Sequence, residues 1–133
     1  MLRQTNRASK IFRAFLMVAV VAAASSQLGC YTSNVDKKVK PDPIPAGYLG
    51  SHDNPIKCDS DLGEHEYLKK LRGPDGKRVK YDKVDTEVDD KTYATIDRFI
   101  VQSSDGSVVR EVFMNPNYPG AVEKRPIDGF TMK

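Results

Sequence analysis

The segment 52–66 holds the densest group of side chains in the chain that could bind a metal ion or transfer a proton. It reads HDNPIKCDSDLGEHE, and its candidate ligands are His52, Asp53, Cys58, Asp59, Asp61, Glu64, His65 and Glu66. A zinc site needs three or four such groups, but no Cys-x2-Cys or His-x3-His spacing occurs. We therefore predict no metal site, with His52 and His65 as weak candidates, and no cofactor.

A calcium loop and a catalytic centre are also disfavoured. Asp59-x-Asp61 begins like a calcium loop, but Gly63 comes one position early and no acid stands at the twelfth position. No serine elbow, P-loop or dinucleotide fingerprint is present. Cys58 lacks a neighbouring base with an orienting group, so we expect it to be a small buried apolar residue. We predict no catalytic residue.

Two other groups of residues could bind a ligand. The acids of 82–90 could face cations, but a solvated loop is the expected structure there. Five aromatic residues could form a ligand-binding platform: Tyr81, Tyr93, Phe99, Phe113 and Tyr118. Core packing is the expected use of most of these rings.

The N-terminus, residues 1–29, has the layout of a signal peptide. Residues 1–13 contain four basic residues and no acids, and an uninterrupted apolar run over 14–24 follows them. Eleven apolar residues are too few to span a bilayer core as a helix, which takes about 20. The pattern predicts an exported protein.

Cys30 ends this segment in the sequence Gln27-Leu28-Gly29-Cys30. The last two residues resemble a bacterial lipobox, in which the cysteine receives a diacylglycerol and the chain is cut before it. Leu28 is bulkier than usual there, and Gln27 stands where leucine is usual. Cleavage after the small residues 22–24 is the alternative, and a bond between Cys30 and Cys58 could then form. We predict lipidation of Cys30.

Residues 30–46 are expected to form a tether, because they carry three prolines, several charges and no apolar periodicity. Tyr31 resembles the residue found after the cysteine in lipoproteins sent to the outer membrane. Without the four basic residues of 1–29, the chain has 17 basic and 18 acidic residues, a net charge of −1. This balance argues against nucleic acid as a partner.

Residues 47–133 are expected to fold as one small domain. Asp61 and Glu64 suggest a capping box that starts a helix over 61–72, with an apolar stripe from Leu62 to Leu71. We predict strands over 79–84, 93–102 and 107–114, a loop over 86–91 and a hairpin turn at 103–106. Residues 121–133 look irregular, although Ile127 and Phe130 could pack back.

The fold class that follows is α+β, with one helix packed on a small, mainly antiparallel sheet of three or four strands. The hairpin 93–114 concentrates the apolar residues of the domain. We therefore expect Leu68 and Leu71 of the helix to pack on it, with Phe99 or Phe113 opposite.

Several turn and packing motifs resemble those of a small uncharacterised family of bacterial exported proteins and lipoproteins. They are Asn54-Pro55-Ile56-Lys57-Cys58, the run 67–76, Tyr118-Pro119-Gly120 and Gly129-Phe130. Relatives often carry a cysteine where this chain has Gly73, bonded to the one matching Cys58, and that partner is missing here. The resemblance implies an exported small domain and transfers no catalytic residue.

Two classes of function remain. The first is a non-catalytic cell-envelope lipoprotein, held by its lipid in the outer membrane facing the periplasm, whose domain binds an envelope protein, peptidoglycan or a small ligand. The second is a secreted small enzyme or enzyme inhibitor. The missing catalytic constellation favours the first.

Overall fold

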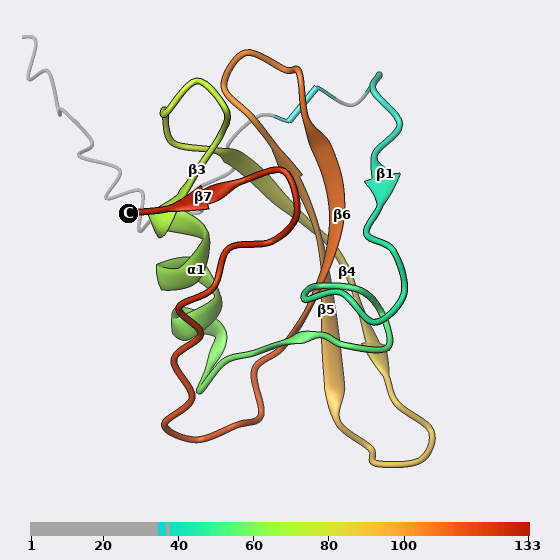
Figure 1. Ribbon diagram of the computed structural model, residues 1–133. Coiled ribbons are helices and arrows are strands. Elements are labelled where there is room, and N and C mark those ends of the chain that lie inside the picture. The colour runs from blue at the N-terminus through green and yellow to red at the C-terminus, as the bar shows by residue number, and fades with distance from the viewer. Residues whose placement is uncertain (1–34, 37) are drawn as a thin grey trace, which may run out of the picture. The chain divides into compact units, whose positions relative to one another are not determined.

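The computed structural model describes residues 35–36 and 38–133 (Figure 1). The predicted signal peptide and Cys30 lie outside the described residues, so the structure leaves both as predictions. In the part of the chain that it does describe, no helix has the length and apolar character that crossing a membrane requires.

The centre of the fold is an antiparallel meander of three strands, β4 (Lys80–Val88), β5 (Thr95–Gln102) and β6 (Val109–Asn115). Two short strands, β1 (Asp42–Pro43) and β2 (Ile56–Lys57), pair with β6 in parallel and complete a five-stranded sheet. A second sheet joins β3 (Leu71–Arg72) to β7 (Thr131–Met132) in antiparallel fashion. Figure 1 shows β1 beside β6 and β3 beside β7.

The predicted fold class is wrong. Of the described residues, 36% lie in strands and 10% in the helix, and the main sheet is a mixed one of five strands rather than a small antiparallel one. The difference comes from strands of two residues, which are too short to carry an alternating apolar pattern. Proline lies within β1 and directly before β2. Proline argues against a strand in the sequence, although an edge strand tolerates it, so these two strands are harder to predict.

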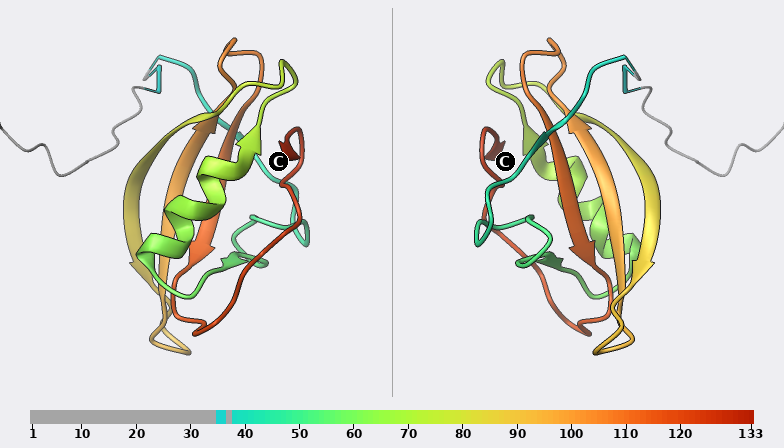
Figure 2. Two further views of the ribbon diagram at one scale, coloured as in Figure 1. Left: turned by 90° about the vertical axis from the view of Figure 1, so that its left-hand side faces the viewer. Right: turned by 90° about the vertical axis from the view of Figure 1, so that its right-hand side faces the viewer.

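The helix α1 (Asp61–Lys70) lies over one face of the main sheet (Figure 2). Ser60 caps it, because its side chain accepts a hydrogen bond of 3.2 Å from the backbone N–H of Gly63. The predicted cap, Asp61, is therefore the first helical residue. Glu64 falls one position too late for a capping box, and its side chain is buried instead. The helix ends before Leu71, which turns extended and begins β3.

The core forms between α1 and the sheet, and it confirms the predicted role of the hairpin. Leu68 and Leu71 belong to the same buried cluster as Phe99 on β5, and Val112 and Met114 join it from β6. Ile127 and Phe130 pack back into this cluster as expected. Of the two rings proposed to lie opposite the helix, Phe99 is the one in the core, whereas Phe113 lies on the other face and is only half-buried. One part of the prediction is wrong, because Leu62 is 67% exposed instead of lying on the apolar stripe.

Strand β4 continues through the range that was predicted to be a loop, 86–91, as far as Val88. Its outer edge has no partner among the described strands, so its side chains are mostly exposed and polar and give no strand pattern. A bulge between Lys83 and Asp85 shifts its register against β5. Because one extra residue reverses which side chains face the core, Lys83 and Thr86 both point to the helix side.

Part of the range predicted as a tether, 30–46, lies against the sheet. Asp42 and Pro43 pair with β6, and Ile44 is buried in the core cluster. The backbone N–H groups of Val35 and Asp36 donate to side chains of Asp82 and Gln102. The packed part of the chain therefore begins before residue 47.

Candidate functional site

The two histidines that the sequence singled out lie on opposite faces of the main sheet. His52 Nε2 is 3.3 Å from Glu87 Oε2, and its ring meets the edge of Phe113 at 5.0 Å between centroids. His65, on α1, has Nδ1 at 3.3 Å from the hydroxyl of Tyr81, a core residue. Each histidine is thus paired locally, and they do not form a shared site.

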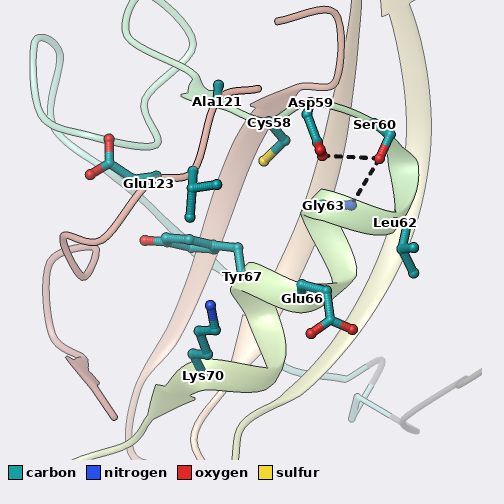
Figure 3. Close-up of a pocket in the computed structure, with 11 residues that line it drawn as sticks. Cys58, Asp59, Ser60, Leu62, Gly63, Glu66, Tyr67, Lys70, Ala121 and Glu123 are labelled. Carbon is teal, nitrogen blue, oxygen red and sulfur yellow. Dashed lines mark hydrogen bonds between the residues drawn. The ribbon is translucent and has the colours of Figure 1, made fainter. Parts of the chain in front are cut away.

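Cys58 lies at the start of α1, beside a pocket formed by the helix and the segment 121–123 (Figure 3). The thiol is 2% exposed, which confirms the prediction of a buried small residue. Burial, together with the charges of Glu64 and Asp59, raises the pKa of Cys58 to about 12. A thiol with such a pKa is protonated at neutral pH and is a poor nucleophile.

This α1 pocket has a volume of about 280 Å³. It is lined by Cys58, Asp59, Ser60, Leu62, Gly63, Glu66, Tyr67, Lys70, Ala121, Val122 and Glu123. Sites for small molecules usually span about 300–1,000 Å³, so this pocket lies at the lower limit of that range and has room for one large side chain.

Hydrogen bonds fix the positions of two residues that line the α1 pocket, Tyr67 and Glu123. The hydroxyl of Tyr67 donates a hydrogen bond of 2.8 Å to the backbone carbonyl of Arg125. Glu123 accepts bonds from the backbone N–H groups of Lys124 and Arg125 and from the Arg125 guanidinium. The Arg125 bond lowers the pKa of Glu123 to about 2, so this wall residue stays ionised.

The rim of the α1 pocket combines exposed apolar surface with negative charge. Leu62 is 67% exposed and Val122 is 62% exposed, and both line the pocket. Three acids, Asp59, Glu66 and Glu123, and one lysine, Lys70, line it as well, and Glu66 and Glu123 are paired with Lys69 and Arg125. Large exposed apolar side chains beside a pocket are typical of interaction surfaces.

A second feature, the carboxylate cluster, lies between the start of α1 and the sheet. It consists of Asp61, Glu64 and Asp97, whose nearest ligand oxygens all lie within 4.8 Å of one another. Asp61 is exposed, whereas Glu64 and Asp97 are buried at 0% and 2% exposure. Asp97 belongs to β5 and faces the helix because it alternates with Phe99 and Val101 of the core.

Both carboxylate oxygens of Asp97 have partners on β4. Its Oδ2 is 2.6 Å from Lys83 Nζ, and its Oδ1 accepts a hydrogen bond of 2.5 Å from the hydroxyl of Thr86. Both partners reach it because of the bulge in β4. Burial alone would lower the pKa of the Lys83 ammonium, but its hydrogen bond and charge interaction with Asp97 raise it above the usual value.

Glu64 is not satisfied. Neither of its carboxylate oxygens has a hydrogen-bond partner among the described residues. Burial raises the pKa of Glu64 to about 8, and the nearby charge of Asp97 adds to the rise. An ionised carboxylate without a partner is costly in a protein interior, so Glu64 favours the protonated form.

Sequence reasoning included Asp61 and Glu64 among the possible ligands but missed Asp97, Lys83 and Thr86. Asp97 stands inside an apolar strand run, which is the one signal that could have marked it as a buried acid. The pairing of Asp97 with Lys83 and Thr86 depends on the bulge in β4, which no sequence pattern predicts.

A scan against protein-family models and searches of curated proteins and of solved structures gave no match to this chain. The resemblance to a family of bacterial exported proteins therefore stays a prediction.

Proposed function

We propose that the chain is a non-catalytic cell-envelope lipoprotein whose folded domain binds a partner protein through the α1 pocket. In this proposal the lipid is attached to Cys30, and the domain sits at the outer membrane and faces the periplasm. The observation that carries the binding role is the pair of exposed apolar residues, Leu62 and Val122, beside a small pocket.

The partner that fits the α1 pocket is a protein segment with one large apolar side chain next to a lysine or arginine. The pocket volume of about 280 Å³ holds one anchoring side chain. Of the three acids in its lining, Glu66 and Glu123 are paired with Lys69 and Arg125, so Asp59, which has no ion-pair partner among the described residues, is the acid that favours a basic neighbour.

The arrangement of the reactive side chains supports a binding role over an enzymatic one. His52 and His65 lie on opposite faces of the sheet and have separate partners. Cys58 is buried, and its raised pKa keeps the thiol protonated. Neither histidine nor the cysteine therefore belongs to a nucleophile–base pair.

The lipid anchor is tested by fractionation. The protein is expressed with its own N-terminus in a Gram-negative host, and membranes are separated on a density gradient. We expect the parent chain in the outer-membrane fraction and Cys30→Ala in a soluble or mislocalised form. Equal distribution of the two forms after signal cleavage would contradict the anchor.

The binding site is tested by photo-crosslinking in intact cells. A benzoylphenylalanine is placed at Leu62, at Val122 and, as a control, at Val88, which is similarly exposed but lies at the end of β4. We expect one protein adduct shared by positions 62 and 122 and missing at 88. The crosslinked peptide, identified by mass spectrometry, should contain an apolar residue beside Lys or Arg.

A binding assay with the identified protein then separates a docking site from chance proximity. Leu62→Lys and Glu66→Gln alter the rim at exposed positions, and Val88→Lys is the matched control. We expect at least about a tenfold loss of affinity for Leu62→Lys and none for Val88→Lys. Adducts of glycan instead of protein, or equal adducts at position 88, would refute the proposed site.

A further inference from the structure

Glu64 is a buried acid whose carboxylate has no hydrogen-bond or ion-pair partner among the described residues. Its side chain is fully buried, and both carboxylate oxygens lack a hydrogen-bond partner. Among the described residues, the cation near the carboxylate cluster is Lys83, and it is bound to Asp97 at 2.6 Å. Native proteins rarely leave a buried carboxylate without a partner, which points to an additional ligand at this place.

The spacing of the carboxylate cluster suits one metal ion. Its three carboxylates, Asp61, Glu64 and Asp97, have ligand oxygens that lie within 4.8 Å of one another. Calcium–oxygen bonds are about 2.4 Å long, so two oxygens on opposite sides of one ion lie about 4.8 Å apart. The two bonds that Asp97 already makes leave a lone pair on each oxygen for a further ligand.

The chemistry of the donors defines the class of ion. All three are carboxylate oxygens, with no thiolate or imidazole in the group, which favours calcium, magnesium or manganese over zinc or copper. When a cation displaces the proton of Glu64, three carboxylates against one lysine leave two negative charges, which one divalent cation balances. Asp61 is exposed and gives the ion a path from solvent.

We infer that Asp61, Glu64 and Asp97 form a binding site for a divalent cation of the hard, oxygen-preferring class, with calcium as the first candidate. The ion would join the start of α1 to strand β5 and supply the missing partner of Glu64. Three protein ligands with water completing the shell correspond to weak binding, with a dissociation constant on the order of 0.1–1 mM, as in extracellular calcium modules. This site is independent of the α1 pocket.

The test uses the purified full-length protein after removal of ions with EDTA. Calcium, magnesium and manganese chlorides are titrated separately to about 10 mM, while calorimetry and thermal unfolding are recorded. We expect saturable binding of one ion per chain and a rise in the melting temperature. Manganese gives a direct second readout, because its free-ion paramagnetic resonance signal falls on binding.

Variants assign the ion to the cluster. Glu64→Gln keeps the shape and removes the charge, and Asp61→Asn alters an exposed ligand that the fold does not need. We expect each to weaken binding at least about tenfold. Lys83→Met removes the competing cation and should tighten binding. Glu66→Gln, on the same helix but outside the cluster, is the matched control and should bind like the parent.

The absence of saturable binding by the parent for all three ions would overturn the site and leave a proton as the sole ligand of Glu64. Equal affinity of the parent and Glu64→Gln would overturn it as well, because the ion would then bind elsewhere. Tighter binding by Lys83→Met supports the site specifically, since general damage to the fold would weaken binding.

Discussion

The C-terminal end of α1 packs on the main sheet through apolar side chains, whereas its N-terminal end approaches the same sheet through charged and polar side chains. Towards its C-terminus, Leu68 and the following Leu71 join a closed apolar cluster with Phe99 and Val101 of β5. Towards its N-terminus, Glu64 approaches Asp97 of the same strand, and Lys83 and Thr86 complete a polar group. The apolar end is stabilised by burial of side chains that carry no charge. The polar end is stable only while each charge has a partner, and it therefore responds to pH, ions and single charge changes.

The largest effect is expected at the apolar end. Phe99→Ala should lower the free energy of unfolding by about 3–5 kcal/mol, because it removes a fully buried ring from the core. A small domain with a total of about 5 kcal/mol would be largely unfolded. Thermal and urea unfolding measure this. Phe113→Ala, on the half-buried face, is the comparison and should cost only about 1 kcal/mol. A Phe99→Ala protein that melts like the parent would show that the ring lies outside the core.

At the polar end, stability should depend on pH through Glu64. Its pKa rises from 4.5 to about 8 in the folded chain, where Asp61, Asp97 and Lys83 face it. The folded state holds this proton more tightly, so the stabilisation is complete below about pH 4.5 and is lost as pH rises through about 8. The size is on the order of a few kcal/mol.

This pH dependence is measured by urea unfolding in EDTA between pH 5 and 9. Glu64→Gln should abolish the fall in stability over this range, because glutamine has no proton to lose. Glu66→Gln, an exposed acid of the same helix, should keep the slope of the parent. An unchanged slope in Glu64→Gln would assign the pH dependence to other groups.

Removing one partner of the Lys83–Asp97 ion pair should destabilise the domain more than removing both. Lys83→Met should cost about 2 kcal/mol at pH 7, because among the described residues it leaves the buried charge of Asp97 bonded to the Thr86 hydroxyl alone. The double variant Lys83→Met with Asp97→Asn should recover most of this loss, because neither charge remains. Chemical unfolding of the parent, both single variants and the double variant tests the coupling, and additive costs would contradict it.

The smallest effect is expected at the first turn of α1. Ser60→Ala should cost about 1 kcal/mol, because it leaves the backbone N–H of Gly63 without its cap. Asp61→Ala, at the position that the sequence favoured as the cap, should cost only a few tenths through the helix dipole. Thermal unfolding in EDTA ranks the two variants. A larger loss of stability for Asp61→Ala than for Ser60→Ala would show that Asp61 is the cap.

Long patterned segments of the sequence predicted their structure well. The apolar runs on either side of Asp105-Gly106 form the antiparallel hairpin of β5 and β6, and Gly106 adopts the positive φ of 76° that the turn requires. The helix was placed within two residues of its observed end. These features follow from local periodicity and turn chemistry, which neighbouring residues encode together.

The strands that the sequence did not predict are held by distant partners. β1 and β2 have two residues each and pair with β6, which lies more than fifty residues later in the chain. β3 interrupts the predicted helix because β7, at the far end of the chain, offers it a partner. Such pairings carry no local signal, so the sheet was predicted too small.

The amino-acid sequence by itself determined the hairpin, the helix and the burial of Cys58, because each rests on local pattern or on residue type. It also placed Asp61 and Glu64 on one helix turn. Only the tertiary structure decided that Glu64 faces inward towards Asp97, that His52 and His65 lie apart, and that a bulge in β4 turns Lys83 and Thr86 to the helix side. The physical reason is that a site depends on the register between strands and on the face that a helix buries, and both are settled by contacts between segments far apart in the chain.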